Sequence, residues 1–187
     1  MKFLNRWATI FGTVSLVSFS TIAAHSLQLA DGTIFFAKSP RLLNVTASYQ
    51  SVNIPAAKYY FTLELPENAG EPLQKITIKQ RRGVEVVNFR LEETLAFTGE
   101  YRHRGENLTL DSVSQDEANN NISVAFDPPI QPGTTFTVGL KTRRNPRYSG
   151  VYLFGVTAFP VGVKPYGLYL GVGRLHFYDG NGNFIFH

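Results

Sequence analysis

The sequence predicts an all-β fold, a single antiparallel β-sandwich of the immunoglobulin-like kind, and three observations support this fold class. Strand-forming residues dominate the chain, with 15 Phe and 9 Tyr against one Met and one Trp in 187 residues. Short alternating segments recur every 8 to 15 residues or so, separated by turns rich in Gly and Pro. Long helical patterns are absent from the sequence. We therefore expect roughly nine to eleven short strands in one domain.

The strongest strand pattern lies between residues 150 and 178. In residues 151–159 both alternating sets of side chains are apolar, which predicts a central strand buried on both faces. Pro160, Gly162 and residues 165–167 end this strand, and a second strand over residues 168–178 returns along it. The two segments predict a β-β unit around which the other strands are arranged.

The first 26 residues have the features of a secretory signal peptide. Lys2 and Arg6 form a positive region, residues 8–17 form a short apolar region, and Ala24 and Ser26 are small residues suited to cleavage. Cleavage after Ser26 gives a mature domain over 27–187, and cleavage after Ala24 adds two residues to it; either product would be exported to the periplasm, the extracellular space or a thylakoid lumen. The alternative is an uncleaved anchor, but the apolar run is short for a span of about 20 residues. We expect no transmembrane anchor after cleavage.

Cysteine usage and charge exclude several functional classes. The chain contains no Cys, which excludes disulfides, thiolate metal sites and cysteine nucleophiles. Its formal net charge of +4 falls to about +2 once Lys2 and Arg6 are removed with the leader. So small an excess of basic residues gives no support for nucleic-acid binding.

The remaining strands follow from local alternation and turn residues. Residues 59–65 and 73–80 alternate clearly between apolar and polar side chains, as half-buried antiparallel strands do. Pro132 and Gly133 suit the central positions of a type II turn. The other expected strands are residues 33–36, 42–50, 107–113, 121–126, 134–141 and 184–186.

The segment from 84 to 97 does not fit this alternation. Its apolar residues at positions 84, 87, 91 and 95 match a helical stripe, and an irregular edge crossing is the alternative. We expect at most a short helical turn near residues 90–97.

Several sequence blocks resemble a known family. They are FDPPIQPGTTFTVGL (126–140), RNP (144–146), GVYLFGVTAFPVG (150–162) and GRLHFYD (173–179), with ETLAFTG (93–99) upstream. They are similar to the small exported cyanobacterial proteins grouped as domain of unknown function 2808. The resemblance implies an exported, single-domain, mainly β protein without an assigned activity, and it supplies no functional residues to transfer.

The main candidate binding site is the basic loop over residues 141–148. Arg143, Arg144 and Arg147 can donate paired hydrogen bonds to sulfate, phosphate or carboxylate groups, and Tyr148 can stack on a sugar or pack against a partner. The basic stretches 81–82 and 102–104 would join this site if the loops gather at one end of the sandwich. The alternative is a solvated hairpin loop whose charges maintain solubility.

Other chemistry-bearing patterns are weak. Residues 179–183, Asp-Gly-Asn-Gly-Asn, resemble the start of a calcium loop but lack its later acidic ligand, so a hairpin turn is the simpler interpretation. His176 alternates with Arg174 and Tyr178, which indicates a packing or surface residue. There is no nucleophile motif and no paired carboxylate signal. The sequence therefore predicts no catalytic residue, metal site or cofactor.

These observations predict a non-catalytic binding or structural protein of the cell envelope. Its partner would be an anionic envelope polysaccharide, or an extracytoplasmic protein, contacted through loops that a rigid scaffold fixes in place. Two alternatives stay open. The chain could be an accessory subunit or assembly factor of an extracytoplasmic complex, which predicts an exposed apolar patch or free sheet edge. It could also be a hydrolase with a dispersed site, which predicts a pocket holding titratable groups with shifted pKa values.

Overall fold

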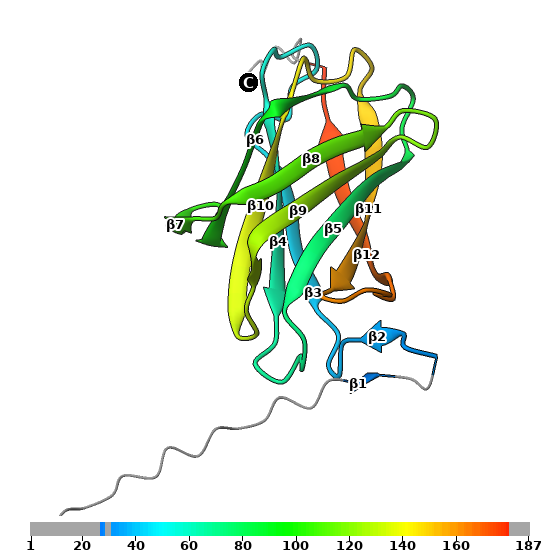
Figure 1. The fold of residues 1–187 in the computed structure, drawn as a ribbon. Coiled ribbons are helices and arrows are strands. Elements are labelled where there is room, and N and C mark those ends of the chain that lie inside the picture. The colour runs from blue at the N-terminus through cyan, green and yellow to red at the C-terminus, as the bar shows by residue number, and fades with distance from the viewer. Residues whose placement is uncertain (1–26, 29–30, 180–187) are drawn as a thin grey trace, which may run out of the picture.

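The computed structural model describes residues 27–28 and 31–179 of the chain. Two five-stranded antiparallel sheets face each other across one hydrophobic core (Figure 1). The predicted all-β sandwich is confirmed. The described residues form no helix, so this part of the chain offers no helical segment capable of crossing a membrane.

The two sheets have the strand orders β3-β4-β10-β6-β7 and β12-β11-β5-β9-β8. The first sheet comprises β3 (Arg41–Ala47), β4 (Lys58–Leu65), β10 (Thr134–Thr142), β6 (Phe89–Glu100) and β7 (His103–Asn107). The second comprises β12 (Leu168–Phe177), β11 (Gly150–Pro160), β5 (Leu73–Arg82), β9 (Asn121–Ile130) and β8 (Leu110–Asp116). A short pair, β1 (Leu27–Gln28) and β2 (Ile34–Phe35), lies at one end of the sandwich (Figure 1).

The core is built from the alternating apolar sets that the sequence displays. On β4, Tyr59, Phe61, Leu63 and Leu65 are fully buried, and the Phe61 ring meets Phe154 of the opposite sheet edge to face at 6.0 Å. Each such side chain contributes about 1.5–3 kcal/mol of transfer free energy. Burial on this scale provides stability in a chain without disulfides.

The prediction that residues 151–159 are buried on both faces is wrong for one face. Tyr152, Phe154, Val156 and Ala158 of β11 point into the core and are buried. The opposite set, which includes Phe159, is only half-buried on the outer face of the second sheet. The ammonium group of a lysine on β5 lies 4.4 Å from the centroid of the Phe159 ring. Together with the Arg81 guanidinium, which lies 5.4 Å from the centroid of the Tyr169 ring, this lysine partly covers the aromatic side chains of the outer face.

The helical turn expected near residues 90–97 is also wrong, because this segment belongs to β6. Lys141 of β10 pairs with Arg90, whereas Gly139, two residues earlier, pairs with Leu95. Strand β6 therefore carries extra residues at this point, as a β-bulge does. The bulge interrupts the alternation, and the resulting apolar spacing resembles that of a helix.

One end of the sandwich gathers three connections that are distant in sequence. The 48–57 connection, the 83–88 crossing and the 143–149 loop all lie at the end opposite β1 and β2 (Figure 1). We call this the basic end. The expected strand at 184–186 and most of the turn at 179–183 fall outside the described residues.

Candidate binding surface at the basic end

The 143–149 loop is anchored by a buried asparagine at its centre. Asn145 is 2% exposed, and its Oδ1 accepts a hydrogen bond from the Tyr59 hydroxyl at 3.0 Å. Its Nδ2 donates to the carbonyl oxygens of Tyr49 (3.0 Å) and Ser51 (2.8 Å). A buried amide with all these partners satisfied fixes one loop conformation, because any other arrangement leaves polar groups unpaired.

Backbone hydrogen bonds attach the same loop to both neighbouring connections. The Asn145 amide donates to Ile54 at 2.7 Å, and the Pro146 carbonyl accepts from Asn53 at 2.9 Å. On the other side, the Arg143 amide donates to Asn88 at 2.8 Å. The loop is therefore held at several points along its backbone, which leaves its outward side chains available for contacts.

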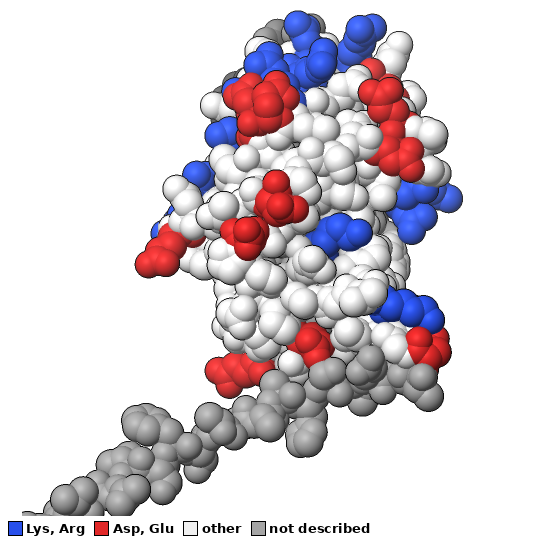
Figure 2. Space-filling view, in the orientation of Figure 1, with Lys and Arg blue, Asp and Glu red and all other residues white. Residues whose placement is uncertain are grey.

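Three arginines and a tyrosine project from this fixed loop. Arg143, Arg144 and Arg147 are exposed, and Tyr148 is 58% exposed. Within the described chain, none of these guanidinium groups takes part in an ion pair. Figure 2 shows Lys and Arg side chains gathered at this end of the molecule, with acidic side chains among them.

The carboxylate of Glu85 lies at the base of the loop. Its Oε1 accepts hydrogen bonds from the backbone amides of Arg147 and Tyr148, and it lines a groove of about 180 Å³ between the 85–88 and 143–147 segments. Here the carboxylate positions the backbone of the loop. It also offsets part of the positive charge around the groove.

Two of the three basic stretches meet at this end. Arg81 and Arg82 line a second groove of about 210 Å³ that shares Glu85 with the first. The 102–104 stretch lies elsewhere, because Arg104 is stacked against aromatic rings on the outer face of the first sheet. The expected gathering of basic loops is therefore realised for the 81–82 and 143–147 segments alone.

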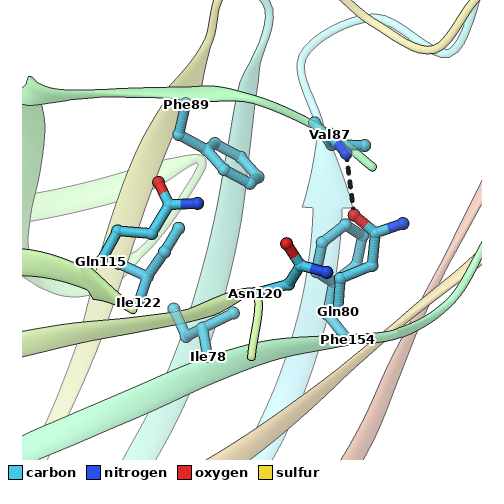
Figure 3. A pocket seen from close by; sticks show the side chains of 8 residues that line it. All are labelled: Ile78, Gln80, Val87, Phe89, Gln115, Asn120, Ile122 and Phe154. Carbon is cyan, nitrogen blue, oxygen red and sulfur yellow. Dashed lines mark hydrogen bonds between the residues drawn. The ribbon is translucent and has the colours of Figure 1, made fainter. Parts of the chain in front are cut away.

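A small cavity shows how the 83–88 crossing is fixed. Figure 3 shows Gln80 beneath the crossing, where its Oε1 accepts a hydrogen bond from the Val87 amide at 2.9 Å. Its Nε2 donates to the Glu85 carbonyl at 2.7 Å. The cavity measures about 10 Å³, has room for roughly one water molecule, and is lined by apolar and amide side chains alone. It therefore serves to anchor the crossing and contains no titratable group.

Two tyrosines below the loop are kept neutral by their surroundings. Burial is the main cause that raises the pKa of Tyr59 far above its usual value, and the neighbouring Tyr152 adds to the effect. Burial, followed by the nearby Glu85 carboxylate, also raises the pKa of Tyr152, whose hydroxyl donates to the Tyr148 carbonyl at 3.1 Å. Both phenols therefore act as hydrogen-bond donors that support the loop.

The remaining candidates lie apart from this surface or serve structure. His176 is half-buried and its ring stacks on Tyr178 at 4.3 Å. Asp179 accepts a hydrogen bond from the Ser149 hydroxyl at 2.9 Å. In the described part of the chain, no cluster of three or more His, Asp or Glu residues could bind a metal ion.

Residues 33–177 match the family described as Protein of unknown function (DUF2808). The chain belongs to this family. In this DUF2808 chain the RNP triplet at 144–146 has a structural role, because its central residue, Asn145, anchors the basic loop. Sequence reasoning had selected the neighbouring arginines and missed Asn145 and Glu85.

Solved structures with partial likeness to this DUF2808 domain include bacterial surface proteins. The collagen-binding domain of a Staphylococcus aureus adhesin is 11% identical, with a TM-score of 0.43 over 76% of this chain and 100% of that one. The group B streptococcus pilus 2b backbone protein is 16% identical, with a TM-score of 0.46 over 74% of this chain and 57% of the pilus chain. The N-terminal domain of the Streptococcus gordonii adhesin Sgo0707 is 12% identical, with a TM-score of 0.47 over 78% of this chain and 34% of the Sgo0707 chain.

The DUF2808 domain spans about half of the pilus chain and a third of the Sgo0707 chain. No curated protein sequence matches it.

Proposed function

We propose that this chain is an exported, non-catalytic binding protein that captures an anionic polymer of the cell envelope through its basic end. The observation that carries the proposal is the exposure of Arg143, Arg144 and Arg147 on a loop whose backbone is pinned by Asn145. The backbone of such a loop loses little conformational freedom when a ligand arrives, so only the side chains have to be ordered. The leader at residues 1–26 would deliver the mature domain to the periplasm, the extracellular space or a thylakoid lumen.

The binding mechanism follows from the chemistry of guanidinium groups. Each planar arginine head can donate two parallel hydrogen bonds to a carboxylate or sulfate group. Arg82, across Glu85, extends the positive surface along the same end, whereas the Arg81 guanidinium lies over the Tyr169 ring, 5.4 Å from its centroid. Tyr148 offers an exposed ring for a sugar face. Because the contacts are solvent-exposed and charged, the affinity should fall as salt screens them.

The accessory-subunit alternative has one observation in its favour. Tyr169 and Val172 on β12 are 47% and 46% exposed, and they share the outer face of the second sheet with the half-buried apolar side chains of β11. An exposed apolar face of this kind suits contact with another protein. The hydrolase alternative has no comparable observation in its favour.

The test is co-sedimentation of the chain from Leu27 onward with insoluble bacterial cell-wall polysaccharide at low and high salt. We expect salt-sensitive pelleting that is lost when Arg143, Arg144 and Arg147 are all changed to Ser. A charge-matched control changes Lys38, Arg41 and Lys164 to Ser, which removes the same charge far from the basic end. The polymer after chemical reduction of its carboxyl groups serves as the uncharged comparator.

Equal losses in the two triple variants would contradict a specific site and indicate a general charge effect. Pelleting that carboxyl reduction does not diminish, or no pelleting at any salt concentration, would also sink the proposal. In that case the exposed face of β11 and β12 becomes the surface to test for protein partners.

A further inference from the structure

A larger concave surface lies on the outer face of the first sheet, away from the basic loop. It is a groove of about 370 Å³ between the edge strand β3 and the turn that joins β6 to β7. Its walls carry Asn44 and Thr46 on one side and Glu100, Tyr101, Arg102 and His103 on the other. The volume falls within the range of small-ligand sites, about 300–1,000 Å³.

The floor of the groove is formed by Thr62, a small side chain on β4 in the middle of the sheet. Thr62 of β4 and Thr137 of β10 are paired across the two strands, and their hydroxyls are hydrogen-bonded at 2.9 Å. Both are buried although they face outward from the core. A neighbouring position on β4 holds the much larger Tyr60, so the smaller Thr62 leaves a depression beside it.

The wall formed by the β6–β7 turn is fixed by aromatic stacking. The Tyr101 ring lies on Tyr60 with centroids 4.1 Å apart, and Arg104 donates a hydrogen bond to the Tyr60 hydroxyl at 3.1 Å. Gly99 has φ +84°, and a Cβ there would collide with the His103 carbonyl, so glycine is needed for the chain to bend at this point. The groove is therefore formed before any ligand binds.

The side chains that line the groove have hydrogen-bonding capacity to spare. Within the described residues, the side chains of Asn44, Thr46, Glu100, Arg102 and His103 make no hydrogen bond or ion pair. Together they offer donors and acceptors, and the charges of Glu100 and Arg102 offset each other. Hydroxyl groups both donate and accept, so this lining matches a polyol better than an anion.

We propose that this groove binds an uncharged saccharide, with Asn44, Thr46, Glu100, Arg102 and His103 hydrogen-bonding its hydroxyls and Tyr101 forming the apolar wall. The offsetting charges of Glu100 and Arg102 give a polyanion no net attraction, which distinguishes this site from the exposed arginines of the basic end. A chain with two such surfaces would contact a mixed polymer at both its charged and its neutral segments. This site is independent of the proposed function, because either one can bind without the other.

The test is an NMR titration of the nitrogen-15-labelled chain from Leu27 onward. The probes are four uncharged hexasaccharides: β-1,4-glucose, α-1,4-glucose, mannose and N-acetylglucosamine. We expect at least one to shift the amides of residues 44–48 and 100–103, with a dissociation constant on the order of 1 mM, as befits a shallow site with few contacts. Asn44→Ala and His103→Ala, both at exposed positions, should each weaken binding by about tenfold.

The triple Ser variant at Arg143, Arg144 and Arg147 is the matched control and should bind the saccharide like the wild type. Three outcomes would overturn the proposal: no shift with any of the four probes, shifts confined to other surfaces, or undiminished binding by both groove variants. Because the basic end is tested with a charged polymer and the groove with neutral ones, failure of either proposal leaves the other standing.

Discussion

The 143–149 loop and the β6–β7 turn both project side chains into solvent, but they are held in different ways. The loop is fixed from below by the buried Asn145 amide and by backbone hydrogen bonds. The turn is fixed from within by its own side chains, since Arg104 and Tyr101 stack on the outer face of the sheet. At the loop, anchoring and binding residues are thus separate, whereas at the turn Tyr101 forms part of both the anchor and the groove wall.

The largest expected effect is the loss of the buried amide. Asn145→Ala leaves the Tyr59 hydroxyl and the carbonyls of Tyr49 and Ser51 without their partner, and we expect it to lower the free energy of unfolding by about 3 kcal/mol. For a domain of this size that corresponds to roughly 6–12 °C in Tm. Thermal and urea unfolding measure the change.

Asn145→Asp sharpens this prediction. The aspartate keeps the shape of the side chain and the oxygen that accepts from Tyr59, but it replaces the NH2 group that donates to two carbonyls with an acceptor oxygen. We therefore expect a loss of unfolding free energy at least as large as that of the alanine variant. Asn119→Ala, at an exposed turn position, is the control and should cost far less. If the aspartate variant unfolds like the wild type, the buried amide does not anchor the loop.

The second effect concerns the side-chain anchor of the turn. Arg104→Ala removes a guanidinium that lies 4.8 Å from the Phe97 ring centroid and 5.4 Å from that of Tyr101. We expect a loss of about 1–2 kcal/mol, because several stacking contacts and one hydrogen bond are lost together. Arg104→Lys should recover only part of it, since an ammonium lacks the planar face.

Arg102→Ala, at the tip of the same turn, is the control for Arg104. Its side chain is exposed and makes no contact that anchors the turn, so the free energy of unfolding should change by less than about 0.5 kcal/mol. Equal losses for the two arginines would mean that the turn is stabilised by charge alone.

A smaller, pH-dependent effect comes from Glu93, whose carboxylate pairs with both Arg90 and Lys141 on the first sheet. Hydrogen bonds first from Lys141 and then from Arg90 lower the pKa of its carboxyl below the ordinary 4.5. Because its pKa is lowered in the folded state, this carboxylate stabilises the fold at pH values above its ordinary pKa. The contribution disappears as the pH falls through the folded-state pKa.

Glu93→Gln should therefore lower Tm slightly at pH 7 and not at all in strong acid, as read from Tm across pH 2–7. The variant also releases Lys141 and Arg90 beside the basic loop, so capture of the anionic polymer at pH 7 should become tighter. A Tm difference that grows as the pH falls would contradict the assigned direction of the pKa.

The fold was predictable where the alternation of side chains is regular. The segments of β4, β5 and β10 were expected nearly at their observed bounds, because one face of each contacts the core. At β6 the bulge between the residues paired with Gly139 and Lys141 disturbs the alternation, and the apolar spacing resembles that of a helix. Strand β7 is exposed along its whole length, so no apolar periodicity marks it.

The candidate site was predictable only in its exposed half. Adjacent arginines are visible in the sequence, whereas the partners of Asn145 lie 86 to 96 residues away from it along the chain. The RNP triplet gave one hint, an asparagine before a proline between two strands, but nothing local shows that its amide is buried. The saccharide groove escaped detection because its two walls come from strands at opposite sides of one sheet.

The smallest effect on stability is expected for the three arginines that we propose bind the polymer. Changing Arg143, Arg144 and Arg147 to Ser removes only exposed side chains from a loop whose backbone is held elsewhere, so the free energy of unfolding should change by less than about 0.5 kcal/mol. Polymer capture should be lost in the same variant. A marked drop in Tm would mean that these arginines stabilise the loop. The variant's loss of binding would then report unfolding, and anchoring and binding would not be separate at the basic end.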